Sequence, residues 1–306
     1  MSDRDGLLLV DKARGITSHD AVQIARRRTH IKKIGHSGTL DPLATGLLIL
    51  CVGKATRLQA YLMEMEKVYE GTIQFGWATD SYDATGVPVG EKTPAEVGRE
   101  RVAKEARSFV GEIDQIPPRF SAKKIEGVRA YELARRGEMP VMTAKRVTIS
   151  EFEIMAVTGS TAAFRVRCSA GTYVRSLAHD LGVKLGVGAH LLSLSREAIG
   201  GFHRSDAIGS EALDRATREQ VFASPHFQTL REAELPLANV LIDRMQEEKL
   251  VRGEVVIVKP ESPIKESELV SVRNPDGELV AIAEVAQVLR EGGPVALQPK
   301  VVLRGR

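Results

Sequence analysis

A single carboxylic acid lies in a segment rich in turn-forming residues. Asp41 belongs to the stretch GHSGTLDPLATG at 35–46, and the apolar run LLILCVG at 47–53 follows at once. The glycines and the proline favour a sharp turn over a continuing helix, and the short apolar run is typical of a buried strand. Asp41 is therefore expected on a loop beside the core, where Pro42 restricts its backbone. A carboxylate held in this way could act as a nucleophile or could stabilise a developing cation.

Two other interpretations of this segment are open. Asp-Pro is an ordinary turn sequence, so Asp41 could serve only to cap its own backbone. The start of the segment also resembles the Gly-x-Ser-x-Gly elbow of serine hydrolases, with Ser37 as the nucleophile. That pattern fails because Thr39 stands where the last glycine is needed, and because the expected strand follows the loop instead of preceding it.

An arginine is expected near the start of a helix in the second half of the chain. In the segment SAGTYVRSLAHDLG at 169–182, Gly171 and Thr172 mark a turn into a helix, which places Arg175 in the first helical turn. A cation there opposes the helix dipole and needs a nearby anion. Asp41 is the anion we expect, and a local pair with a surface carboxylate is the alternative.

Several other side chains fit either a structural or a functional role. Tyr69 falls in a strand pattern at 66–76, where an aromatic residue commonly just packs. His36 could be an ordinary loop histidine. The cations at 26–33 suit a solvated helix end or phosphate contacts. Residues 119–136 hold six Lys or Arg against two Glu, interleaved with two aromatic residues. This mixture suits RNA binding, and a solvated helix face is the alternative.

The composition is that of a soluble globular protein with one large domain or two. The chain has 306 residues, of which 43% are hydrophobic and 27% charged, and a net charge of +3. Neither a membrane-spanning run nor a signal-peptide core is visible, and Cys51 and Cys168 suit buried thiols in a reducing compartment. We therefore expect a cytoplasmic protein. Metal-ligand spacing, a dinucleotide fingerprint and a Walker loop are missing, so we expect neither metal nor cofactor.

The elements that must position these residues follow from the hydrophobic pattern. Strands are expected at 6–12, 47–53, 66–76, 147–155 and 162–168, and helices at 19–28 (capped by Ser18), 54–65, 94–110 and, after a composition shift, 211–231. Short strands at 255–259, 269–272, 279–285 and 301–303, with a hairpin turn at 274–277, predict a small C-terminal barrel.

Four of these segments resemble the TruB family of tRNA pseudouridine synthases. They are the Asp41 loop, the opening LLLVDKARGITS at 7–18, the IPPRFSAKK segment at 116–124 and GTYVR at 171–175. The resemblance implies an α+β pseudouridine-synthase fold, with a central mixed, largely antiparallel sheet flanked by helices. It also implies a catalytic domain at 1–234 and a small, β-rich, PUA-like RNA-binding domain at 235–306.

The resemblance assigns roles to individual residues. It implies that Asp41 is the nucleophile, that Tyr69 lies against the target base and that Arg175 forms a salt bridge with the aspartate. It also implies that His36 assists base flipping and that Leu194 completes the pocket wall. An insertion at about 117–140 would clamp the RNA, and its candidate contacts are Arg119, Lys123 and Lys124.

The reaction that the resemblance implies is isomerisation of uridine to pseudouridine at position 55 in the T-arm of tRNA. Such a monomeric enzyme would need no metal, cofactor, membrane or guide RNA. Two alternatives are a related guide-RNA-dependent synthase and an RNA-folding factor whose catalysis is dispensable.

Overall fold

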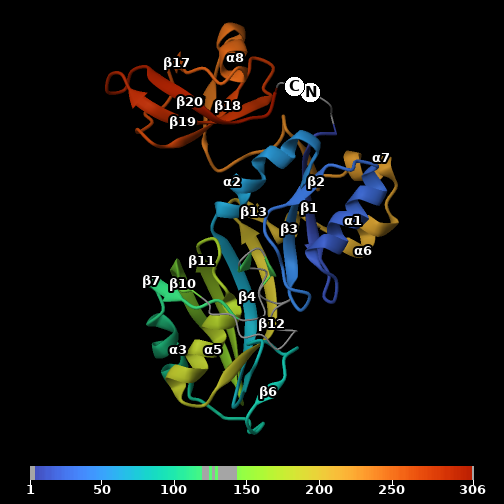
Figure 1. The fold of residues 1–306 in the computed structure, drawn as a ribbon, viewed down its shortest axis with the longest axis vertical. Coiled ribbons are helices and arrows are strands. Elements are labelled where there is room, and N and C mark those ends of the chain that lie inside the picture. Colours follow the sequence, from blue (N-terminus) through green and yellow to red (C-terminus); the bar gives the residue numbers. More distant parts are fainter. Residues whose placement is uncertain (1–3, 119–123, 126–127, 130–142, 305–306) are drawn as a thin grey trace.

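The computed structural model describes residues 4–118, 124–125, 128–129 and 143–304, and these residues form two main β-sheets (Figure 1). The larger sheet has eleven strands within the described ranges, with the central order β14-β1-β3-β12-β4-β11-β10-β7. Its strands are β1 (Gly6–Lys12), β2 (Ile34–His36), β3 (Thr45–Val52), β4 (Lys67–Phe75), β7 (Gly111–Gln115), β10 (Lys145–Thr158), β11 (Thr161–Cys168), β12 (Ala189–Ile199), β13 (Phe202–His203), β14 (Ile208–Gly209) and β15 (Phe227–Thr229).

Helices cover the two halves of this sheet separately. Figure 1 shows α1, α6 and α7 beside β1 and β3, whereas α3 and α5 lie beside β10 and β11. Their bounds, with two 3₁₀ turns and the short helix before β4, are α1 (Ser18–Thr29), η1 (Gly53–Leu58), α2 (Gln59–Glu64), α3 (Arg99–Arg107), α5 (Val174–Leu185), η2 (Arg204–Asp206), α6 (Ser210–Arg215) and α7 (Arg218–Ala223). The pairing is mostly antiparallel. It is mixed because β3–β12 and β1–β14 are parallel. The sequence-based prediction of fold class is confirmed.

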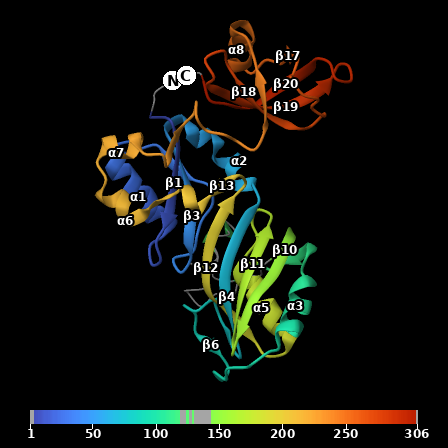
Figure 2. The ribbon, with the colours of Figure 1, turned by 180° about the vertical axis from the view of Figure 1, so that it is seen from behind.

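The C-terminal strands form a second, five-stranded sheet of order β16-β18-β19-β20-β17, which lies at one end of the molecule (Figure 2). These strands are β16 (Ala238–Leu241), β17 (Val256–Val258), β18 (Leu269–Arg273), β19 (Leu279–Val288) and β20 (Val295–Val302), with helix α8 (Arg244–Val251) against them. The predicted hairpin turn joins β18 to β19, where Gly277 donates to the carbonyl of Asn274 at 2.9 Å. This curled sheet agrees with the PUA-like unit expected there.

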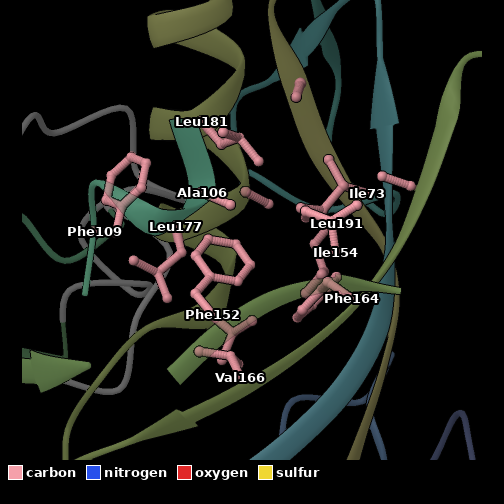
Figure 3. Close-up of a cluster of buried hydrophobic side chains, with 14 of the residues drawn as sticks. Ile73, Ala106, Phe109, Phe152, Ile154, Phe164, Val166, Leu177, Leu181 and Leu191 are labelled. Atoms are coloured by element: carbon pink, nitrogen blue, oxygen red, sulfur yellow. The ribbon is translucent and has the colours of Figure 1, made fainter. Parts of the chain in front are cut away.

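Strand β1 is buried on both faces, which explains its continuous apolar run. Leu8 and Val10 pack with α1 and α7 residues, whereas Leu7 and Leu9 join a cluster that includes Ile282 of the C-terminal sheet. A separate core fills the other half of the large sheet, where Phe152 and Phe164 of β10 and β11 meet Leu177 and Leu181 of α5 (Figure 3). The two halves meet where β3 pairs with β12, and residues of both strands belong to the cluster that contains Leu7 and Leu9.

Four predicted elements were wrong in their details. Thr17, not Ser18, caps α1, because its hydroxyl and the Asp20 carboxylate form a reciprocal capping box. The helix expected at 94–110 begins only at Arg99, since Gly98 before it has extended backbone. The helix expected at 211–231 is two short helices and β15, because Ala216 is extended. The strand expected at 301–303 is the end of β20, which starts at Val295.

None of the helices in the described ranges has the length and apolarity needed to cross a bilayer.

The junction of β3 and β12 depends on one glycine of the Asp41 segment. Gly46 has φ +102°, and a Cβ there would come within 2.4 Å of the carbonyl oxygen and 2.5 Å of the amide nitrogen of Arg196. The buried Arg196 side chain in turn donates to the carbonyls of Leu47 (2.7 Å) and Gly38 (3.1 Å). This close backbone approach therefore fixes both ends of the Asp41 loop.

We predict that Gly46→Ala lowers the free energy of unfolding by more than about 2 kcal/mol, because the left-handed φ and the backbone clash act together. Denaturant unfolding measures this effect. Gly201→Ala is the control, since Gly201 lacks positive φ and has open space around it. Equal midpoints for the two variants would contradict the rigid junction.

Candidate active site

The turn between β1 and α1 holds the Asp41 loop in place. The Ser18 hydroxyl donates to the carbonyl of Leu40 (3.2 Å) and accepts from its amide (2.8 Å), and the Gly15 amide donates to the carbonyl of Pro42 (2.8 Å). Asp41 itself begins a turn, since its carbonyl accepts from the amide of Ala44 at 3.0 Å. The turn interpretation and the functional interpretation are thus compatible, because the turn is what presents the carboxylate.

Ser37 has no access to a substrate. Its side chain is fully buried, and its hydroxyl accepts a hydrogen bond from the amide of Ile49 at 3.3 Å. The structure therefore agrees with excluding the serine-elbow interpretation.

Arg175 and Asp41 form the predicted ion pair. Arg175 Nε lies 2.9 Å from one carboxylate oxygen of Asp41, and a terminal guanidinium nitrogen lies 3.3 Å from the other. Two-point contacts of this kind fix orientation as well as charge. The Asp41 side chain is 41% exposed, whereas the Arg175 side chain is only 6% exposed. The loop presents the acid to the cavity and keeps its partner beneath it.

A second acid shares this guanidinium, and the sequence interpretation missed it. Asp83, whose side chain is 6% exposed, lies 3.5 Å from Arg175 Nη1, and the carbonyl of Ser81 accepts from the same nitrogen at 3.0 Å. The turn-rich segment at 79–86 signalled a loop. Nothing in its spacing indicated that the loop would reach a helix almost a hundred residues later.

Asp41 and Arg175 line a cavity of about 520 Å³. Of the predicted site residues, Asp41, Tyr69, Arg175 and Leu194 line it, whereas His36 is not part of the lining. The side chains in the lining that sequence reasoning did not assign to the site include Met63, Lys67, Lys145, Tyr173 and Arg196. Cavities of this size suit a single flipped nucleotide better than a duplex.

Burial in the cavity wall shifts the pKa values of two side chains, Tyr69 and Lys67, toward their neutral forms. Burial raises the pKa of Tyr69, while the Arg196 guanidinium acts in the opposite direction. A protonated phenol can pack against a nucleobase but is a poor proton acceptor. Burial also lowers the pKa of Lys67 to about 8, although its ammonium group donates to the carbonyls of Leu62, Met63 and Met65.

His36 lies at the end of β2, next to the loop. Its Nδ1 accepts a hydrogen bond from the amide of Gly38 at 3.3 Å, and burial lowers the pKa of the ring. The structure thus gives His36 a local bonding role, and its expected part in base flipping stays a prediction.

The predicted basic surfaces have different outcomes. Arg27 and Arg28 both pair with Asp214, at 3.1 and 3.0 Å, which agrees with a stabilised helix end. Arg119 and Lys123 lie outside the described residues, as does most of the insertion expected at 117–140. Lys124 belongs to the two-residue strand β8 (Lys124–Ile125), paired with β9 (Val128–Arg129).

In the described part of the chain, no three His, Cys, Asp or Glu side chains cluster in a way that could hold a metal ion. Cys51 and Cys168 are both free and buried, and burial raises their pKa values to about 12 and about 11. These thiols are therefore protonated core side chains.

Comparisons with known proteins agree with this geometry. Residues 26–174 match the model of the TruB family pseudouridylate synthase N-terminal domain. A tRNA pseudouridine synthase B of Solibacter usitatus is 40% identical over 92% of this chain and 96% of its own length. One of Thermobifida fusca is 39% identical over 98% and 99%. A crystal structure of a Cbf5–Nop10–Gar1 complex superposes with TM-score 0.77 at 25% identity, covering 99% of this chain and 86% of the solved one.

The fold and the acid-bearing cavity thus define a pseudouridine synthase. The chain belongs to the TruB family of these enzymes.

We predict that Arg175→Lys slows pseudouridine formation by about 10- to 100-fold, because lysine cannot make the two-point contact and each charge-assisted hydrogen bond contributes about 1.5–3 kcal/mol. Single-turnover rates on RNA measure this loss. Arg165→Lys is the matched control, since Arg165 pairs with Glu70 on a partly exposed part of the sheet. A rate like that of the wild type would mean that the two-point contact is dispensable.

A second prediction concerns Lys67, whose pKa of about 8 in the folded protein is below the ordinary value of 10.5. Between these two pH values the unfolded chain binds more protons than the folded chain, so the free energy of unfolding rises with pH. Lys67→Met removes this contribution and should flatten the rise between pH 8 and pH 10. Urea unfolding across that range tests it, with the exposed Lys300→Met as control. An unchanged slope would contradict the shift.

Proposed function

We propose that this protein converts uridine to pseudouridine at position 55 in the T-arm of tRNA, as a single chain without a guide RNA. The observation that carries the proposal is the Asp41 carboxylate, exposed to a cavity of nucleotide size and fixed from below by the buried Arg175. The isomerisation breaks the bond between ribose C1′ and N1, rotates the base and forms a bond between C1′ and C5. N1 gains a proton and C5 loses one, so no redox step is involved.

Asp41 is the nucleophile in this proposal. A carboxylate beside a sugar of oxocarbenium character performs the same task in retaining glycosidases. Arg175 orients the carboxylate by its two-point contact. The uridine must leave its stack to reach the acid, which costs a few kcal/mol. Tyr69, a neutral phenol on the cavity wall, then packs against the extruded base, and Leu194 closes the pocket beside it.

Two comparisons support tRNA as the substrate over a guided RNA. The relatives named tRNA pseudouridine synthase B are similar over nearly their whole lengths at about 40% identity. The solved Cbf5 complex is more distant, at 25% identity. We also propose the division into a catalytic domain at 1–234 and an RNA-binding, PUA-like domain at 235–306, and clamping of the RNA by the insertion at 117–140.

We predict that Asp41→Asn abolishes pseudouridine formation in a bare T-arm stem-loop while the Kd for that RNA changes less than about threefold, because the amide keeps the shape but not the nucleophile. Tritium release from RNA labelled at uridine C5 measures turnover, and filter binding measures the Kd. Asp114→Asn is the control, since Asp114 is an exposed acid paired with Arg146.

Three outcomes would overturn parts of the proposal. Turnover by Asp41→Asn would remove Asp41 as the nucleophile. Activity of the wild type only with an added guide RNA would favour the guided class. Growth of cells with Asp41→Asn but not with a deletion would show that RNA folding, and not catalysis, is the required activity.

A further inference from the structure

Tyr82 has an unusual backbone conformation for an aromatic residue. Its φ is +64°, in the left-handed region, which costs a non-glycine residue about 1–2 kcal/mol. It lies in the loop between β5 (Ala78–Thr79) and β6 (Pro88–Val89). Of the two other non-glycine residues with positive φ in the described ranges, His30 is the C-cap of a helix and Ser267 lies just before β18. Tyr82 caps no helix, so the strain at this position needs another explanation.

The conformation of Tyr82 turns both of its neighbours toward one atom. The carbonyl of Ser81, just before it, accepts from Arg175 Nη1 at 3.0 Å, and the carboxylate of Asp83, just after it, lies 3.5 Å from the same nitrogen. An extended residue at this position would direct these two groups to different sides. The left-handed residue is therefore what lets one short loop hold the guanidinium by two groups.

The ring of Tyr82 anchors this loop to the helix that carries the arginine. It stacks on His179 with ring centroids 3.9 Å apart and planes 14° apart. His179 lies on α5 four residues after Arg175, one helical turn away and on the same face. The stack thus sets the loop at a fixed height on α5, at the turn next to the guanidinium.

The other side of the loop is fixed to β12. The amide of Leu191 donates to the carbonyl of Tyr82 at 2.9 Å, and the amide of Ala84 donates to the carbonyl of Leu191 at 2.8 Å. Asp83 is held within the loop by the hydroxyls of Ser81 (2.8 Å) and Thr85 (2.6 Å). Both hydroxyls that hold the Asp83 carboxylate therefore belong to the same loop as Tyr82.

The environment of His179 suits a neutral, stacked imidazole ring and not a charged imidazolium. Its Nδ1 is buried and has no hydrogen-bond partner among the described residues, and burial lowers the pKa of the ring. A neutral imidazole at neutral pH stacks on a phenol without the desolvation cost of an imidazolium.

We propose that Tyr82 and His179 form a positioning pair, which sets the Ser81–Asp83 loop on α5 so that Arg175 holds the Asp41 carboxylate in its reactive orientation. This inference rests on the proposed function of Asp41. The pair acts through Arg175 and touches no reacting atom. A different role, direct contact between the Tyr82 ring and RNA, would affect substrate binding instead of the chemical step.

The test uses the full-length protein and four variants of the pair. Tyr82→Asn removes the ring but keeps a residue that tolerates the left-handed backbone. Tyr82→Phe keeps the ring, and His179→Ala removes the partner. The double variant Tyr82→Asn/His179→Ala reports their coupling. Phe222→Ala is the matched control, because it removes a ring from the Phe222–Phe227 pair on α7 and β15.

For steady-state kinetics on T-arm RNA, we expect Tyr82→Asn and His179→Ala each to lower kcat about tenfold with KM changed less than twofold. The double variant should lose no more than either single variant, and Tyr82→Phe should retain the wild-type kcat. A raised KM with unchanged kcat would replace positioning with RNA contact. Additive losses, or an unchanged kcat, would overturn the pair.

A second readout does not depend on turnover. In protein labelled with ¹⁵N-arginine, the Arg175 Nε–H signal, assigned with Arg175→Lys, should exchange slowly with water because it is hydrogen-bonded to Asp41. We expect at least tenfold faster exchange in Tyr82→Asn and no change in Phe222→Ala. An unchanged exchange rate in Tyr82→Asn would overturn the positioning role, whether or not the wild type modifies T-arm RNA. Failure of the wild type to modify T-arm RNA would count against the proposed function alone.

Discussion

The site depends on one buried guanidinium that joins three separate segments. Arg175, on α5, contacts Asp41 from the loop before β3 and both Ser81 and Asp83 from the loop after β5. An arginine buried without partners would be costly, since a charge in the interior must be compensated. Folding therefore cannot bury this helix end without bringing both loops to it, and the position of the acid becomes part of the stability of the fold.

The same logic explains the position of the site in the sheet. Strands β3 and β12 meet at a short parallel pairing of Thr45 and Gly46 with Ser195 and Arg196, beside a core cluster to which both strands contribute. A second buried arginine, Arg196, donates to carbonyls on both sides of the Asp41 loop. Arg175 on α5 and Arg196 on β12 thus both hold the loop that carries the acid.

Local patterns in the sequence predicted β1, β3, β4, β10 and β11 and the Arg175–Asp41 pair, but they did not predict the long strand β12 that carries Leu194 and Arg196. The cation at a helix start required an anion, and the loop beside a buried strand offered one. The same reasoning missed Asp83, because its partner is 92 residues away in sequence and its own segment indicates only a turn. It also treated Ser18 as a helix cap, although Thr17 fills that role and Ser18 bonds Leu40 instead. Polar residues in turns have several possible partners, and tertiary packing selects among them.

The exposure of Asp41 follows from the charges beneath it. Four cationic side chains are buried around the loop and the cavity: Arg175, Arg196, Lys12 and Lys67. The Asp41 carboxylate interacts electrostatically with Lys12. Burial lowers the pKa values of both lysines to about 8, so keeping their ammonium groups charged in the folded protein costs free energy. A fully buried carboxylate would be held away from any substrate. A carboxylate that is 41% exposed above these cations faces the cavity and leaves the remaining positive charge available to the phosphates of a polyanion.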